Sequence, residues 1–139
     1  MTEATIAAHD GSGSRIWRFV GIAMTALLAL AILASAARAF LDPTALALGM
    51  GLPLAAGAHD PFVGVYGIRS FALSLIALVL IWRGDLKALQ VFVLVAALIP
   101  LGDAILVAGE GAPVLKVARH LGFVAFLLLD FAALRAARP

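Results

Sequence analysis

Three ionisable residues, Arg69, Asp103 and His120, stand in stretches otherwise composed of Leu, Ala, Val, Ile and Phe. A charged side chain in the middle of a membrane span costs about 2.5–3.5 kcal/mol, so such residues usually face the protein interior and find partners. Arg69 and Asp103 form a natural ion pair, because an arginine–carboxylate contact can be bidentate. His120 can accept or donate a proton beside them. We therefore expect a polar cluster suited to ligand binding or to acid–base chemistry.

The three residues lie at similar depths along their expected helices. With a rise of about 1.5 Å per residue, Arg69 is about 12 Å from the start of its span, Asp103 about 7 Å from the end of its span and His120 about 10 Å from the start of its span. Consecutive spans run in opposite directions, so all three depths are measured from the same face. The residues therefore converge on one layer near that face.

Helical spacing adds further side chains to this layer. The face that carries Arg69 gains Tyr66, Ser70 and Leu73, and the face that carries His120 gains Lys116. His59 stands just above, at the outer end of the second span, and can line an entrance. A cavity in this place would be polar at its mouth and apolar farther in. The expected ligand-binding residues are Arg69, Tyr66, Ser70, Asp103, His120, Lys116 and His59.

Composition places the chain in a membrane. Of its 139 residues, 64% are hydrophobic and 13% are charged, which is too little charge to cover the surface of a soluble domain. The ten Lys and Arg residues are scattered between apolar runs and form no basic stripe, which excludes nucleic-acid binding. The chain has no cysteine, which excludes disulfides, thiolate metal sites and dithiol redox chemistry.

The apolar runs predict an all-α integral membrane four-helix bundle. Each run has roughly the 20 residues needed to cross the hydrocarbon core. Residues 1–14 are small and polar and are expected to be a disordered tail. Residues 15–139 then form a single domain with spans at about 19–37, 62–82, 86–107 and 114–134.

A secretory signal peptide is the alternative for the first run. Arg15 and Arg18 would be its basic region, and Ala34-Ser35-Ala36 resembles a cleavage site. We favour a retained span, because cleavage would leave three spans with one side uncovered.

The connection between the first two spans predicts a short helix. Asp42-Pro43 suits an N-cap followed by proline at the first helical position, and Gly49 and Gly51 are expected to stop the helix. Its low polarity places it in the membrane interface or as a re-entrant segment. Pro100 is expected to kink the third span.

Basic residues near the span ends predict the orientation. One face collects six of them, against three on the other, so the positive-inside rule places both termini in the cytoplasm. Asp130 falls near the inner face, where we expect a structural role beside Arg18 or Arg83. Arg119 is expected to extend outward and can help to bind an anionic group.

The chain resembles a family of small bacterial four-span proteins known as domain of unknown function 4267. The matching residues are Pro61, Gly64, the Gly67-Ile68-Arg69 triplet, Asp103 and His120. In similar members an acidic residue often follows the arginine, where this chain has Ser70. The resemblance covers about residues 17–134, and it implies a multi-pass protein of the bacterial inner membrane with no established activity.

Two functions remain open from the sequence. The first is a non-enzymatic membrane protein whose polar cluster packs the helices or binds a small amphiphile. The second is a membrane-embedded acid–base enzyme (an isomerase, cyclase or hydrolase) acting on a lipophilic substrate, with Asp103 and His120 exchanging protons and Arg69 stabilising negative charge. Neither needs a cofactor, and one His with one Asp is too few ligands for a metal. The expected partners are the lipid bilayer and a lipophilic small molecule, and a homo-oligomer is left open.

Overall fold

The fold is entirely helical in the part of the chain that the structure describes. The computed structural model describes residues 3–55 and 61–137, with side chains described from residue 13 onward. Four apolar segments have the length and hydropathy needed to cross a membrane: α1 from Gly13, α3, α4 together with α5, and α6. The prediction of an all-α bundle of four long apolar helices with a short connecting helix is confirmed. The helices are α1 (Glu3–Leu41), α2 (Pro43–Met50), α3 (Pro61–Arg83), α4 (Leu86–Ala96), α5 (Leu98–Gly109) and α6 (Val114–Ala136).

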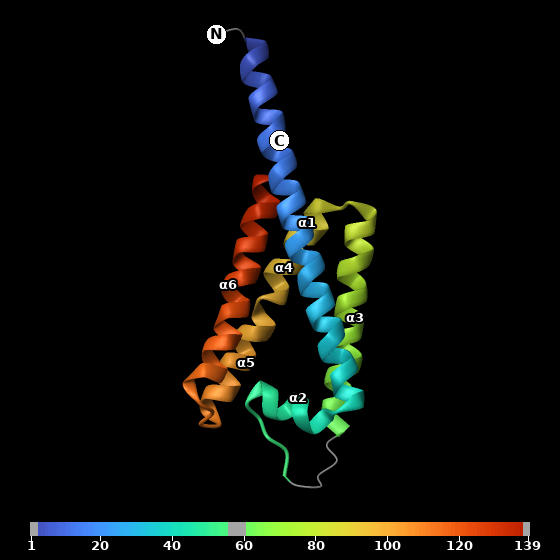
Figure 1. The fold of residues 1–139 in the computed structure, drawn as a ribbon, viewed down its shortest axis with the longest axis vertical. Helices are drawn as coiled ribbons and strands as arrows, with labels where there is room; N and C mark the ends of the chain where they lie inside the picture. Colours follow the sequence, from blue (N-terminus) through green and yellow to red (C-terminus); the bar gives the residue numbers. More distant parts are fainter. Residues whose placement is uncertain (1–2, 56–60, 138–139) are drawn as a thin grey trace.

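The first helix is longer than the sequence predicted. α1 starts at Glu3 and extends beyond the bundle at its N-terminal end (Figure 1). We expected a disordered tail over residues 1–14, whereas the structure continues the helix through most of that range. This stretch contains no proline, so nothing in it blocks a helix already nucleated by the apolar span.

The short helix α2 begins and ends where its sequence signals predict. Asp42 is the N-cap, and its Oδ1 accepts a hydrogen bond of 2.9 Å from the backbone N–H of Ala45. Gly51 follows the helix with a φ of 97°, a left-handed conformation that glycine adopts without steric cost. A Cβ on Gly51 would also lie 2.9 Å from Val107 Cγ1, so the turn approaches α5 closely.

The third apolar segment is divided into α4 and α5 at Ala97. Pro100 lies three residues beyond this break. Because proline has no N–H and its ring crowds the carbonyl four residues earlier, it disrupts the helix at Ala96. The break therefore falls one turn before the proline itself. Ala96 and Pro100 both line the cavity described below.

The helices pack around a small apolar core. α1 packs against α3 and α6, and α6 packs against α4 and α5. A Cβ on Gly67 of α3 would lie 2.8 Å from the Cβ of Ala39, so glycine permits the close approach of α1 and α3. α2 lies across the end of the bundle opposite the start of α1 and the end of α6 (Figure 1). The buried core residues are Leu28, Leu89, Val93, Ala96, Ala97, Leu127 and Leu134.

Candidate functional site

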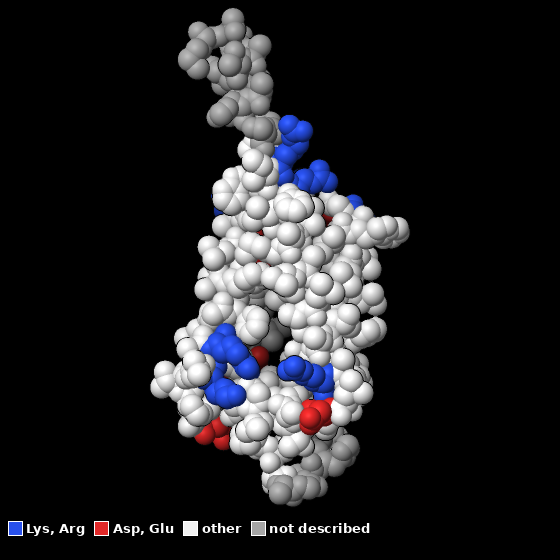
Figure 2. Space-filling view, in the orientation of Figure 1, with Lys and Arg blue, Asp and Glu red and all other residues white. Residues whose placement is uncertain are grey.

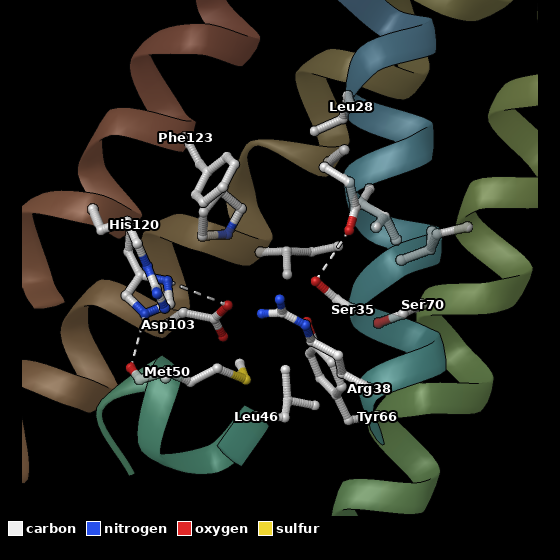
Figure 3. Close-up of a pocket in the computed structure, with 18 of the residues that line it drawn as sticks. Leu28, Ser35, Arg38, Leu46, Met50, Tyr66, Ser70, Asp103, His120 and Phe123 are labelled. Atoms are coloured by element: carbon white, nitrogen blue, oxygen red, sulfur yellow. Dashed lines mark hydrogen bonds and ion pairs between the residues drawn. The ribbon is translucent and has the colours of Figure 1, made fainter. Parts of the chain in front are cut away.

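A cavity of about 260 Å³ lies between the helices next to α2. Its polar side chains gather at the end near α2, whereas Leu28 and Phe123 lie farther along the bundle (Figure 3). The same end of the molecule is hollowed between two groups of basic side chains, and acidic atoms are visible inside the hollow (Figure 2). The polar lining residues are Ser35, Arg38, Tyr66, Ser70, Asp103, Arg119 and His120.

Asp103 and His120 meet in the wall of the cavity. His120 Nδ1 lies 3.9 Å from Asp103 Oδ2, and the two side chains are 6% and 32% exposed. This distance is too long for a hydrogen bond, so the contact is electrostatic. The carboxylate of Asp103 is partly exposed to the cavity, whereas the imidazole of His120 is almost fully buried in the cavity wall.

The other ring nitrogen of His120 is bonded to the backbone of α2. Nε2 lies 3.1 Å from the carbonyl oxygen of Met50. A carbonyl oxygen can only accept, so Nε2 carries the proton and Nδ1 is the nitrogen left for Asp103. The imidazole is therefore fixed in orientation by the helix that lies across the end of the bundle.

Lys116 also binds the end of α2. Its Nζ donates a hydrogen bond of 3.2 Å to the carbonyl oxygen of Gly49. The last carbonyls of a helix lack partners within it and favour cationic groups. Lys116 and His120 stand one turn apart on α6, so together they attach α2 to α6. Lys116 was expected to bind a ligand, but it does not line the cavity.

Arg69 does not form the ion pair predicted from the sequence. It is exposed and is not part of the cavity lining, and the carboxylate of Asp103 instead lies beside His120. The inward face of α3 carries Tyr66, Ser70 and Leu73. One residue turns a helix by about 100°, which carries Arg69 away from Ser70 and out of the cavity. The prediction of an Arg69–Asp103 pair is therefore wrong.

Arg38 occupies the place expected for Arg69. It stands in the last turn of α1, and its guanidinium points into the cavity on the side opposite Asp103 (Figure 3). Arg119 of α6 lines the same cavity. In the sequence, Arg38 counted only as one of the three basic residues on the less basic face. The missed signal was its spacing from Ser35, because residues three apart on a helix share a face.

The remaining predicted residues divide between the cavity and the part of the chain that is not described. Tyr66 and Ser70 line the cavity, and Ser70 is 5% exposed. His59 lies outside the described residues. Among the side chains of residues 13–55 and 61–137, no group of three His, Cys, Asp or Glu residues could hold a metal ion.

A second polar contact lies in the other half of the bundle. Asp130 of α6 is fully buried, and its Oδ2 lies 2.8 Å from Thr25 Oγ1 of α1. Its Oδ1 has no hydrogen-bond partner in the part of the chain that the structure describes. The sequence predicted Arg18 or Arg83 as the partner of Asp130. The structure shows that its partner is instead the hydroxyl of Thr25. This contact joins α1 to α6 and lies outside the cavity lining.

Fold and site together define a small bundle of membrane-span helices that encloses a cavity with basic, acidic and hydroxyl side chains at one end. Residues 29–134, more than half of the chain, match the family described as domain of unknown function 4267. The chain belongs to this family, which confirms the resemblance seen in its sequence. Comparisons with curated proteins and with solved structures found no match.

Proposed function

We propose that this protein is a multi-pass protein of the bacterial inner membrane that binds a small amphiphile in the cavity beside α2. The observation that carries the proposal is the cavity itself, which has a volume of about 260 Å³. Its polar lining residues lie at the end near α2, and apolar lining residues such as Leu28 and Phe123 lie farther along the bundle. Ligand pockets are typically apolar with a few converging polar groups, and they often lie between the helices of bundles. A cluster that served only to pack the helices would not need to surround open space.

The polar lining is positioned by attachments that a ligand would not disturb. His120 is bonded to Met50 and Lys116 to Gly49, so the floor beside α2 is held by protein contacts. The polar side chains that face the space come from α1, α3, α5 and α6. His120 and the end of α2 are therefore already ordered before a ligand binds, which lowers the free-energy cost of forming this part of the site.

The orientation of the chain gives this site a position in the membrane. The start of α1 and the end of α6 lie at the same end of the bundle, opposite α2 (Figure 1). With both termini in the cytoplasm, as the basic residues at the span ends favour, the cavity opens at the outer leaflet. Its ligand would then enter from the outer leaflet or from the space outside it.

Native mass spectrometry of the purified protein tests the binding proposal. After equilibration with dodecanoate, dodecanol and dodecylamine in a non-ionic detergent, we expect one bound molecule per chain of at least one of the three. Ala31→Phe should abolish this binding, because residue 31 lines the cavity and a benzyl group would fill it. Ala72→Phe is the matched control, since residue 72 is exposed on α3 and lies outside the lining. Equal binding by the two variants would contradict the proposal.

The Asp103–His120 contact favours acid–base catalysis as a second candidate. The two groups can exchange a proton with a bound molecule, and Arg38 faces them across the cavity, where it can stabilise negative charge. In this scheme Asp103 and His120 are the catalytic residues and Arg38 takes the role first assigned to Arg69. The test compares the lipophilic molecules that copurify with the native chain and with Asp103→Asn. Accumulation of a molecule of different mass in the variant supports catalysis, and identical contents contradict it.

A further inference from the structure

We propose that the ligand of this cavity is a single-chain amphiphile with an anionic head, bound by Arg38 and Arg119 with its tail toward Leu28 and Phe92. This inference rests on the proposed binding function and adds the charge of the head and the number of chains.

The cavity lining is positively charged in every protonation state. Arg38 and Arg119 both line it, and a guanidinium remains charged throughout the physiological pH range. Asp103 is the acidic residue of the lining and contributes at most one negative charge. Protonation of His120 can only add positive charge. At least one positive charge in the lining therefore has no counter-charge there.

The two guanidinium groups are also available for a ligand. The carboxylate of Asp103 lies beside His120, and neither arginine takes part in an ion pair or side-chain hydrogen bond found among the described residues. Arg38 reaches into the open space rather than along the outer surface (Figure 3). A planar guanidinium binds carboxylate and phosphate oxygens through two parallel hydrogen bonds, which makes an anionic oxygen head its best-fitting partner.

A hydroxyl of α3 in the cavity wall supports a polar head in this position. Ser70 is 5% exposed and lines the cavity, and no hydrogen bond to its side chain is found among the described residues. Because Ser70 lines the cavity, its hydroxyl is open to that space and can donate a hydrogen bond to a bound group. Ser70 is drawn on the same side of the cavity as Ser35 and Arg38 (Figure 3), where a carboxylate bound by the arginine can accept a hydrogen bond from its hydroxyl.

The size of the cavity favours one chain over two. Pockets for drug-sized ligands typically measure about 300–1,000 Å³, and this cavity of about 260 Å³ falls just below that range. The two acyl chains of a phospholipid do not fit in such a space. One chain can pass from the arginines to the apolar wall formed by Leu28, Phe92 and Leu127, which lies beyond the polar end.

Matched probes of one chain length test the charge of the head. For the native protein we expect dodecanoate to bind at least about tenfold more tightly than dodecanol or dodecylamine, because charge-assisted hydrogen bonds are formed only with the acid. Arg38→Gln should reduce this preference to less than about threefold. Arg38 is exposed, so its replacement leaves no buried charge unpaired, and Arg119→Gln is a second variant of the same kind. Arg69→Gln is the matched control and should keep the full preference.

Three results would overturn the inference. The first is equal binding of the acid and the alcohol to the native protein. The second is a full preference for the acid in both Arg38→Gln and Arg119→Gln. The third is displacement of dodecanoate by equimolar acetate or inorganic phosphate, which would show a site for free anions rather than for an amphiphile.

These outcomes differ from a failure of the proposed function. If dodecanol binds as well as dodecanoate and Ala31→Phe abolishes both, the cavity binds amphiphiles but does not select an anion. If Ala31→Phe leaves binding of every probe unchanged, the cavity is not the binding site and both proposals fail.

Discussion

Two arginines 31 positions apart in the chain show how much depends on the direction of a single side chain. Arg69 stands inside an apolar run and attracts attention for that reason, yet it lies outside the cavity. Arg38 stands at the end of its span and resembles an ordinary anchoring residue, yet it points into the cavity (Figure 3). Depth along a helix follows from counting residues, but the direction of a side chain also depends on how each helix is rotated against its neighbours.

The sequence therefore predicted part of the site. Asp103, His120, Tyr66 and Ser70 were selected by depth and helical spacing, and all four line the cavity. The contacts of His120 with Met50 could not be predicted, because they depend on where the short helix α2 folds back against the bundle.

Asp103→Asn and His120→Gln test whether the cluster is needed for folding. We expect each variant to change the free energy of unfolding by less than about 1 kcal/mol, because Asp103 is partly exposed and glutamine keeps an N–H donor for Met50. Thermal melting in detergent measures this. A large loss of folded protein from both variants would mean that the cluster serves packing.

Thr25→Val tests the buried contact in the half of the bundle away from α2. It leaves the carboxyl of Asp130 without its hydroxyl partner, so we expect a loss of about 1–3 kcal/mol in the free energy of unfolding. Thr44→Val is the matched control, because residue 44 is exposed on α2. Adding Asp130→Leu to Thr25→Val should recover much of the loss. No difference between the two valine variants would contradict a structural role for this contact.

At the scale of elements, local sequence signals were reliable and long-range placement was not. Asp42 and Gly51 set the bounds of α2, and Pro100 divides the third apolar segment, as their types predict. These signals act over one or two helical turns. The docking of α2 against α6 involves Lys116 and His120, which lie more than 60 positions away. Such contacts leave no periodic pattern in the sequence.

The attachment of α2 can be measured by hydrogen exchange. In Lys116→Ala combined with His120→Ala, we expect faster exchange of the backbone amides of residues 44–50, with little change in α3 or α4. The reason is that two side-chain contacts to the end of α2 are lost while its N-cap at Asp42 remains. Lys87→Ala is the control, since Lys87 is exposed on α4. Unchanged exchange in α2 would show that apolar packing alone holds it.

For the whole molecule, composition and hydropathy predicted a membrane protein with four spans, because a bilayer requires each span to be apolar and about 20 residues long. The long α1 was not predicted, since a short polar stretch can continue a helix without an apolar face. The orientation in the membrane follows from the basic residues at the span ends and remains a prediction.

The absence of cysteine allows a direct test of orientation. Ser14→Cys stands at the end expected in the cytoplasm, and Ala112→Cys stands in the turn between α5 and α6 at the other end. We expect a membrane-impermeant maleimide to label Ala112→Cys in intact cells and Ser14→Cys only after permeabilisation. The reverse pattern would place the cavity in the inner leaflet.

Photo-crosslinking tests the central claim, that the cavity binds a small amphiphile, most directly. A dodecanoate with a diazirine at the end of its chain is bound to the native protein, irradiated and located by peptide mass spectrometry. We predict that the label concentrates on the apolar wall of the cavity around Phe92 and Leu127, and that Ala31→Phe removes it. Labelling spread over outward residues such as Phe71 and Val79, and unchanged in Ala31→Phe, would contradict the claim.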